Sequence, residues 1–396
     1  MKGLRIIIND FGYVEGGASS VALSHIKLFQ DQGLDVLFIS GCSITSENLS
    51  CEHISLKKFS KPRKHTASIL GYIFNYRSKK LISSIIAEKV KKYDDIKIYL
   101  HSWTKFLSPS IFSALKVFEK GIDIVIYSHD YFLECPNGGY FNYKKSQKCL
   151  YRPLSANCIV SNCDKSNYLR KILRLIRNYI QKHFLKGLKF QLICVSEFQR
   201  ERLNIITDIA SSTKVIPNIF KINKPFDKNQ LTNTCDFLYV GRFDKEKGIL
   251  ELLNALTLSK TSCYFCGDGP LYDTIKNHAN TKLSESWLSQ KDVYSLMSTS
   301  KGIIIPSLWN EADPLTSIES ASLGVIRIVS IHCAASAGIQ DGVNGYLIDP
   351  SNIFSFSKTL HKIKNSFENQ ISSEDVISSY DREYSYRKKV SKSYDW

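Results

Sequence analysis

Two glutamates, Glu311 and Glu319, stand on either side of a predicted helix start. Pro314 suits the first turn of a helix because its φ is preset and its missing N–H would have no partner there. Asp313 before it is the candidate N-cap. A helix dipole favours an anion at its N-terminus, so two carboxylates beside free amides suit a ligand with sugar hydroxyls and a diphosphate. The predicted free amides are those of Leu315, Thr316 and Ser317.

An isolated pair of acids has a more ordinary explanation, with Glu311 in a loop and Glu319 on a solvated helix face. A second segment changes that balance. Arg242 and Lys247 lie between a predicted strand and a predicted helix. A cation is unfavourable at a helix N-terminus, so Lys247 there indicates a bound anion. Arginine grips phosphate with two donors and lysine acts as a point charge. The alternative is a solvated lysine and an arginine placed by chance.

Glycine-rich turns follow two other predicted strands. Gly16 and Gly17 come after strand 4–8, and Gly267 lies in the turn Cys266-Gly-Asp-Gly269. Glycine lets the backbone approach a ligand closely at the end of a strand. Taken alone, each sequence is explained equally well by a tight turn.

These segments belong to an alternation of strands and helices that runs through both halves of the chain. It predicts two Rossmann-like domains with parallel sheets, at residues 1–220 and 221–370. The first carries an insertion at about 132–190, and residues 221–234 are the predicted linker. The last segment, 371–396, is expected to be a helical tail that packs back toward the N-terminal domain. Ligands bind at the carboxyl ends of such strands, which is where His101, His129 and Ser196 fall.

Length and composition limit the class of protein. A chain of 396 residues is too long for one ordinary core. No apolar run approaches the roughly 20 residues of a membrane-spanning helix. The apolar start ends at Asn9-Asp10, before a signal-peptide core could form, so a cytoplasmic protein is expected. The eleven cysteines are an odd number and fit reduced thiols.

The formal charge of +16 predicts an anionic partner. Residues 165–189 predict a helix in which apolar and basic residues mix, and residues 55–80 are also basic. Such a helix suits an anionic membrane surface, although it could instead pack on its own domain with a solvated basic face. Nucleic acid is disfavoured because no nucleic-acid-binding motif is found. The basic residues expected to face the membrane are Arg170, Lys171, Arg174 and Arg177.

Four cysteines cluster within the insertion. Four thiolates could hold zinc and fix a long loop, but the spacing is irregular and contains no Cys-x-x-Cys pair. Ordinary reduced cysteines are therefore the default interpretation, with zinc as the alternative. The cysteines are Cys135, Cys149, Cys158 and Cys163.

Together these features resemble the family 4 retaining glycosyltransferases of GT-B fold, in which two Rossmann-like domains face each other across a donor cleft. The resemblance covers nearly the whole chain, and motifs in one order are more specific than any one of them. It is carried by Gly16-Gly17, Ser128-His129-Asp130, Val195-Ser196-Glu197, Val215-Ile216-Pro217-Asn218, Gly241-Arg242, Lys247-Gly248, Cys266-Gly267-Asp268-Gly269 and the pair Glu311 and Glu319.

The resemblance implies a role for each residue. Arg242 and Lys247 would bind the diphosphate of a nucleotide-sugar, Glu319 its ribose hydroxyls, and Glu311 the transferred sugar. His129 would lie beside that sugar, unless it is an ordinary loop histidine bonded to its neighbours. No cofactor or metal would be required, because cations and amides neutralise the leaving diphosphate. Further expected donor contacts are Gly16, Gly17, Gly267, Leu315 and Thr316.

The sequence also departs from the family pattern. The residues after Glu311 are Ala312-Asp313, and residues 330–338 replace a glycine-rich turn. Residues 282–288, which are expected near the nucleobase of the donor, lack a family-like pattern, so the sequence does not predict which base is bound.

The hypothesis is a retaining glycosyltransferase, peripheral on the inner face of the cell membrane. It would act on a glycan or lipid-linked glycan in bacterial-type surface polysaccharide or lipopolysaccharide synthesis. The alternatives are a non-catalytic nucleotide-sugar or membrane-binding protein of GT-B fold, and a GT-B epimerase.

Overall fold

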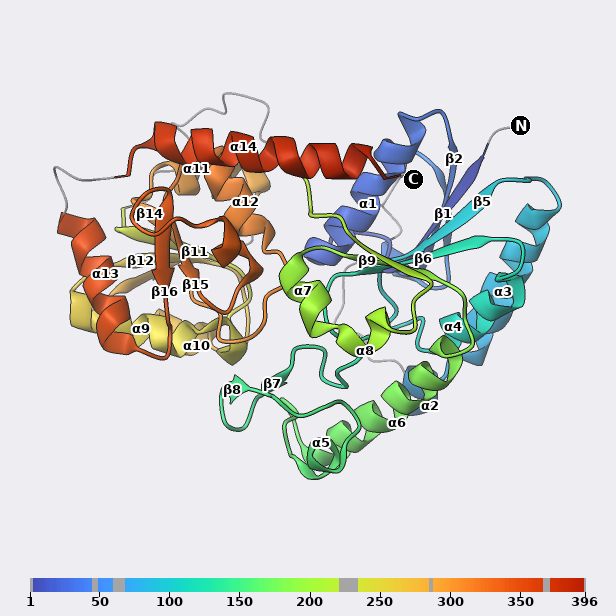
Figure 1. Ribbon diagram of the computed structural model, residues 1–396. Helices are drawn as coiled ribbons and strands as arrows, with labels where there is room; N and C mark the ends of the chain where they lie inside the picture. The colour runs from blue at the N-terminus through green and yellow to red at the C-terminus, as the bar shows by residue number, and fades with distance from the viewer. Residues whose placement is uncertain are drawn as a thin grey trace. The chain divides into compact units, whose positions relative to one another are not determined.

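The computed structural model describes residues 3–44, 49–59, 68–220, 234–284, 288–365 and 371–394 (Figure 1). The chain forms two compact units. The first contains Met1–Tyr140 and Leu150–Ile216, and the second contains Phe141–Cys149 and Pro217–Tyr394. Most of the predicted linker, residues 221–233, lies outside the described residues, as do residues 285–287 of the segment expected near the base.

The first unit is built on a parallel sheet with the strand order β10-β9-β6-β5-β1-β2-β3, and β4 also pairs with β2. Strand β1 lies between β2 and β5: the chain first adds β2 and β3 on one side of β1, and then adds β5, β6, β9 and β10 on the other side. The chain therefore reverses direction across the sheet at β1, and this topological switch point is where such sheets bind ligands. The strands are β1 Leu4–Phe11, β2 Asp35–Ile44, β3 Glu52–Ser55, β4 Lys58–Phe59, β5 Ile96–Leu100, β6 Asp123–Ser128, β9 Gln191–Cys194 and β10 Ser212–Val215.

Helices connect most of these strands, as is usual for parallel pairing. Ile6, Ile98 and Ile126 lie in the core beneath them with no exposed surface. The helices are α1 Gly17–Gln30, α2 Ile69–Ile73, α3 Tyr76–Val90, α4 Ser110–Leu115, η1 Lys116–Phe118, α5 Ala156–Val160, α6 Tyr168–Leu185, α7 Glu197–Arg202 and α8 Asn204–Thr207.

The second unit has a parallel sheet with the order β13-β12-β11-β14-β15-β16. After β11 the chain moves outward to β12 and β13, then returns to place β14 on the other side of β11. The switch point of this sheet therefore lies between β11 and β14. The strands are β11 Phe237–Val240, β12 Cys263–Cys266, β13 Thr281–Leu283, β14 Gly302–Ile305, β15 Arg327–Ser330 and β16 Gly345–Ile348.

The helices of this unit are η2 Lys245–Lys247, α9 Ile249–Ser259, α10 Tyr272–Lys276, α11 Gln290–Ser298, α12 Leu315–Ser322, η3 Ala334–Gly338, α13 Ile353–Asn365 and α14 Ser373–Lys392. The hairpin of β7 (Phe141–Asn142) and β8 (Gln147–Lys148) also groups with it. The predicted α/β class with two parallel sheets is confirmed. Helix α14 packs on α12 within its own unit; whether the tail also reaches the N-terminal domain stays a prediction.

Candidate active site

The loops that follow β11 and β14 bring two of the predicted site residues into contact. Lys247 ends the short helix η2 after β11, and its Nζ donates to Oε1 of Glu311 in the loop after β14. Ser307 donates its hydroxyl to the other carboxylate oxygen of Glu311. The side chains of Lys247 and Glu311 keep only 15% and 14% of their surface exposed. The switch point of the second sheet thus holds a buried ion pair.

This ion pair fixes the charge of Glu311. Burial alone would raise the pKa of its carboxyl, but the Lys247 ammonium and the Ser307 hydroxyl hold that pKa below its ordinary value. The backbone of Glu311 is also anchored, because it forms a β-bridge with Cys333 and its carbonyl accepts from the Ala334 N–H at 2.9 Å. A carboxylate held in this way can accept hydrogen bonds from sugar hydroxyls and offset developing positive charge.

Residues 330–338, which depart from the family pattern in sequence, therefore position Glu311.

Arg242 lies beside this pair and is oriented by acids of its own loop. Its Nη1 is 2.8 Å from Oδ2 of Asp244 and its Nη2 is 3.4 Å from Oε1 of Glu246. The acids are buried, whereas the Arg242 side chain is 60% exposed. The guanidinium therefore has a defined direction and an open face, as phosphate binding requires.

Glu319 lies within α12, facing α11. The hydroxyl of Tyr294 donates to its Oε1 at 3.3 Å. Burial raises the pKa of the Glu319 carboxyl, and the Tyr294 contact opposes that rise. Glu319 is thus a half-buried acceptor that receives hydrogen bonds from Tyr294 and Gln290.

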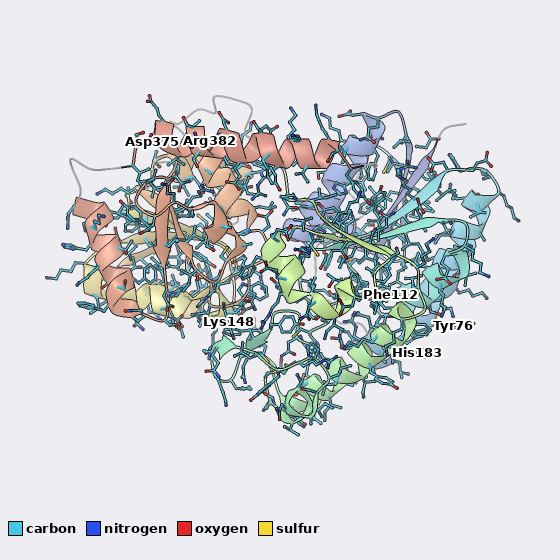
Figure 2. The ribbon with its side chains drawn as sticks, in the orientation of Figure 1. Tyr76, Phe112, Lys148, His183, Asp375 and Arg382 are labelled. Atoms are coloured by element: carbon cyan, nitrogen blue, oxygen red, sulfur yellow. The ribbon has the colours of Figure 1, made fainter. Side chains whose placement is uncertain are left out.

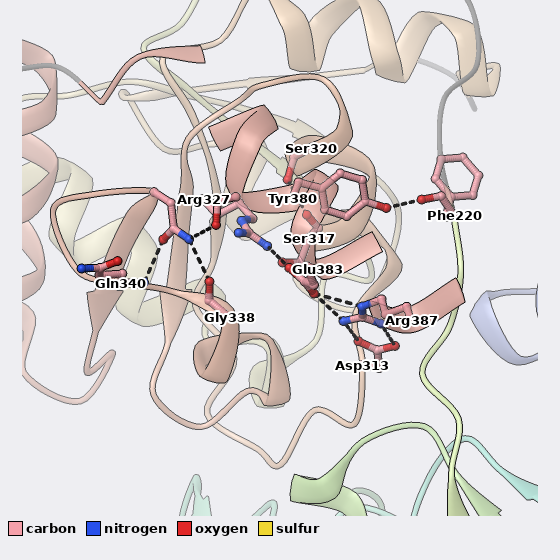
Figure 3. Close-up of polar contacts among 12 residues, drawn as sticks. Phe220, Asp313, Ser317, Ser320, Arg327, Gly338, Gln340, Tyr380, Glu383 and Arg387 are labelled. Carbon is pink, nitrogen blue, oxygen red and sulfur yellow. Dashed lines mark hydrogen bonds and ion pairs between the residues drawn. The ribbon is translucent and has the colours of Figure 1, made fainter. Parts of the chain in front are cut away.

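The predicted start of α12 needs two corrections. The N-cap is Pro314 and not Asp313, and no side chain caps the helix. Asp313 is instead held by Arg387 of α14 at 2.9 and 3.2 Å (Figure 3), because a buried carboxylate needs a charged partner. The Ser317 N–H bonds to the Pro314 carbonyl at 3.0 Å, so it is not free for an anion. Leu315 and Thr316 remain the predicted amide donors.

Glycines allow the loops at this edge to meet. Gly267 has φ +151°, and a Cβ there would lie 1.9 Å from the carbonyl oxygen of Gly241. Gly248 has φ +71°, and its Cβ would lie 1.8 Å from the carbonyl oxygen of Pro306. A side chain at Gly267 would push its loop away from the loop that carries Arg242, and a side chain at Gly248 would push the Arg242 loop away from the residues after β14.

The first unit carries the other predicted residues. Gly17 begins α1, and Gly16 caps it with φ +151°, a conformation that favours glycine. His129 follows β6, and its Nε2 is 2.9 Å from Nδ1 of His101. Its ring also stacks on Tyr127 at 5.0 Å. Burial lowers the pKa of His129 to about 3, so the ring is neutral and can act on a ligand through a hydrogen bond but not through a positive charge.

The predicted membrane-facing cations of α6 are only partly where a membrane could reach them. Lys171 and Arg177 are 1% and 4% exposed, so for these two the prediction is wrong. Arg174 pairs with the buried carboxylate of Asp164 at 2.9 Å. Arg170 is exposed. Alternation with apolar residues favours an outer position for these cations, but the face of α6 that packs contains both polar and apolar side chains.

The possible zinc cluster is also not found. In the parts of the chain that the structure describes, no three histidine, cysteine or acidic residues are grouped so that they could hold a metal ion. Those parts include all eleven cysteines, and none forms a disulfide. The Lys171 ammonium lies between two of the four, with Nζ at 2.9 Å from Sγ of Cys163 and 3.6 Å from Sγ of Cys158.

Several residues of the site were missed in the sequence. Ser307 and Tyr294 bind the two glutamates, and the Trp309 ring lies 5.2 Å from Lys247 Nζ. Ser307 and Trp309 are adjacent to the Glu311 motif and could have been suspected from that. Tyr294 lies 25 residues from Glu319, and no local signal links the two.

The chain is similar in sequence to known glycosyltransferases. Residues 221–378 match the family model described as Glycosyl transferases group 1. An uncharacterized 41.2 kDa protein in the cps region of Klebsiella pneumoniae is 23% identical over 215 residues, 52% of this chain and 58% of that protein. O-antigen chain mannosyltransferase C of Escherichia coli is 29% identical over 139 residues, 33% of this chain and 38% of that protein. The aligned regions thus span only 38% to 58% of these curated relatives.

Solved structures extend the similarity to both units. Anabaena HepE in complex with UDP has a TM-score of 0.63 at 13% identity, over 99% of each chain. The lipopolysaccharide outer core galactosyltransferase WaaB in its apo form has a TM-score of 0.61 at 15% identity, over 98% of each chain. Among the described residues, no helix is long and apolar enough to cross a membrane. The chain has the fold of the GT-B glycosyltransferases, and its residues 221–378 match the model of the group 1 glycosyltransferases.

Proposed function

We propose that this protein is a retaining glycosyltransferase that moves a sugar from a nucleotide-diphosphate-sugar to a glycan or lipid-linked glycan in bacterial-type surface polysaccharide synthesis. The observation that carries the proposal is the group of Arg242, Lys247 and Glu311 at the switch point of the second sheet. Cations can bind a diphosphate, and an ionised carboxylate can bind the hydroxyls of a sugar. The cations lie in the loop after β11 and the carboxylate lies in the loop after β14, on the two sides of the switch point.

In this proposal the diphosphate binds against Arg242 and Lys247, whose charges stabilise it as it leaves. Glu311 holds the transferred sugar and offsets positive charge at its anomeric carbon, and Glu319 accepts hydrogen bonds from the ribose. Neutral His129 donates a hydrogen bond to the sugar. The residues supply positioning and charge, so the reaction needs no metal or other cofactor.

The comparisons support the nature of the donor and the pathway. The HepE structures are described as complexes with UDP, with UDP and glucose, and with UDP-glucose. The curated relatives are named for an O-antigen chain and for a cps region. We infer a nucleotide-sugar donor and an acceptor that belongs to a cell-surface polysaccharide.

The test is donor turnover. The purified protein is incubated with a panel of nucleotide-sugars and with native membranes as the source of acceptor, and release of nucleoside diphosphate is measured. Release from one or a few donors is expected, and the anomeric configuration of the product, read by NMR, should equal that of the donor. A product of opposite configuration would exclude retention.

The same assay separates the two alternatives. A non-catalytic binding protein of GT-B fold would bind a nucleotide-sugar without releasing nucleoside diphosphate from any donor of the panel. A GT-B epimerase would change the sugar of the donor without needing an acceptor.

A further inference from the structure

Helix α6 buries several polar side chains, together with Leu175 and Leu185, and leaves several apolar side chains exposed. Lys171, Asn178 and Gln181 are 1%, 4% and 1% exposed. On the same helix Leu169 and Tyr179 are 73% and 69% exposed. An amphipathic helix that packs on its own domain normally has the opposite arrangement. Two features therefore need an explanation: the buried polar side chains of α6 and its exposed apolar side chains.

Hydrogen bonds to the core of the first unit hold the inner face. Gln181 donates to the carbonyl of Phe132 at 2.8 Å and accepts from the indole N–H of Trp103 at 2.8 Å. Arg177 donates to the Trp103 carbonyl at 3.1 Å and lies 4.9 Å from the ring of Tyr72 in α2. Buried polar groups with such partners are stable, so the rotation of α6 about its axis is fixed.

The outer face forms a continuous apolar stripe. Leu169, Ile172, Ile176 and Tyr179 follow one another at intervals of three or four residues, which places them on one side of the helix over about 15 Å. Ile172 and Ile176 are 37% and 43% exposed. Exposed apolar surface of this extent indicates an interaction.

A second group of exposed apolar side chains lies on the neighbouring helix α2. Helices α2 and α6 pack on each other, and the ring of Phe74, which follows α2, lies 5.8 Å from that of Phe184 in α6. Ile69 and Leu70 of α2 are 63% and 80% exposed. We name the exposed apolar residues of the two helices the α2–α6 surface.

The charge around this surface selects the partner. Helix α6 contains no aspartate or glutamate; of its lysines and arginines Arg170 is exposed, whereas Lys171 and Arg177 are buried and Arg174 pairs with Asp164. Exposed cations lie beside the stripe at Arg170 and just beyond the helix at Lys186, and His183 is exposed in the last turn (Figure 2). A second copy of the chain docked here would bring like charges together. Anionic lipid headgroups would neutralise those charges while the apolar side chains enter the acyl boundary.

We propose that the α2–α6 surface docks on an anionic lipid bilayer. The apolar stripe inserts into the interface, and Arg170 and the cations near the end of α6 contact the headgroups. This surface differs from the basic face expected from the sequence, since Lys171 and Arg177 hold the helix to its unit and do not face lipid. The inference extends the proposed function, because a docked enzyme would meet a lipid-linked acceptor at the membrane.

Vesicle binding tests the proposal. The full chain is sedimented with phosphatidylglycerol vesicles and with neutral phosphatidylcholine vesicles, and binding at least tenfold tighter to the first is expected. The double variant Leu169→Glu, Tyr179→Glu should bind phosphatidylglycerol at least tenfold more weakly. The matched control is Leu258→Glu, Phe354→Glu, which adds the same charge at positions 61% and 66% exposed in the second unit and should leave binding unchanged.

A second measurement does not depend on a charge change. The fluorescence of Leu169→Trp should move to shorter wavelength when phosphatidylglycerol vesicles are added, because the indole leaves water. The proposal would be overturned if the wild-type protein bound neither kind of vesicle, or if the double variant bound phosphatidylglycerol vesicles as tightly as the wild type does. A dimer in ultracentrifugation that the double variant dissociates, without vesicle binding, would assign the surface to a second copy instead.

The outcome is separable from that of the proposed function. Lys247→Ala should lose donor turnover and keep vesicle binding. The double variant should lose vesicle binding and keep donor binding.

Discussion

At the scale of single residues, the chemistry-bearing side chains could be predicted where charge and local sequence agree. Lys247 and Glu311 follow separate predicted strands, and their contact depends on the strand order that makes β11 and β14 neighbours. The role of Asp313 could not be predicted. Its partner Arg387 lies 74 residues away, and nothing in the local sequence of either indicates the pair.

Tyr294 gives a prediction at this scale. Tyr294→Phe removes the hydroxyl that donates to Glu319, and a single hydrogen bond contributes about 0.5–1.5 kcal/mol. Because Glu319 is proposed to bind the donor ribose, the KM for the nucleotide-sugar should rise about two- to twelvefold with little change in kcat. Tyr272→Phe, in α10 of the same unit, is the control. An unchanged KM would show that the hydroxyl does not position Glu319 for the donor.

A second prediction at the residue scale concerns the protonation of His25. Burial lowers its pKa to about 3 from an ordinary 6.5, so the folded protein keeps the ring neutral while the unfolded chain takes up a proton below pH 6.5. The contribution of neutral His25 to the free energy of unfolding is therefore fully present above pH 6.5 and is lost as the pH falls toward 3. By pH 5 the loss should reach about 2 kcal/mol. Urea unfolding at pH 7.5 and 5.0 should show a larger decrease in wild type than in His25→Gln. Equal decreases would mean that His25 titrates normally.

At the scale of elements, the sequence predicted the type of element better than its orientation. The helical spacing in residues 165–189 correctly predicted α6, but it did not show which side would pack. Apolar residues normally mark the packed side. Here Gln181 and Arg177 form hydrogen bonds with Trp103 and Phe132, which are distant in sequence, so polar side chains are buried on the packed side as well.

The contacts of Arg387 give a test of how strongly α14 is held to the loop before α12. Arg387 bonds to Asp313, to Glu383 and to the Asn218 carbonyl, and so joins α14 to the loop before α12 (Figure 3). Removing one partner of a buried ion pair costs about 3–5 kcal/mol, because the other charge is left buried. Arg387→Ala should therefore lower the free energy of unfolding of the second unit by that amount in urea.

The matched control for this experiment is Arg382→Ala, an exposed arginine on the same helix (Figure 2). It should change the free energy of unfolding by less than about 0.5 kcal/mol. If both variants unfolded alike, α14 would not depend on the Arg387 contacts.

At the scale of the whole molecule, alternating strands and helices were enough to predict two units with parallel sheets. The strand order could not be derived from them, since the alternation does not say on which side of the first strand each later one is added. The order matters because it creates the switch point between β11 and β14, where the loops of Lys247 and Glu311 meet. The predicted site is therefore a consequence of the topology of one unit.

The measurement that tests the central claim most directly compares two neighbouring lysines in donor turnover. Lys247 contacts Glu311 at the switch point, whereas Lys245 lies two residues earlier and is exposed. With the donor found from the panel, kcat/KM for nucleoside diphosphate release is measured for wild type, Lys247→Ala and Lys245→Ala. The account predicts at least a hundredfold loss for Lys247→Ala and a change below twofold for Lys245→Ala. Equal activity of the two variants would contradict it.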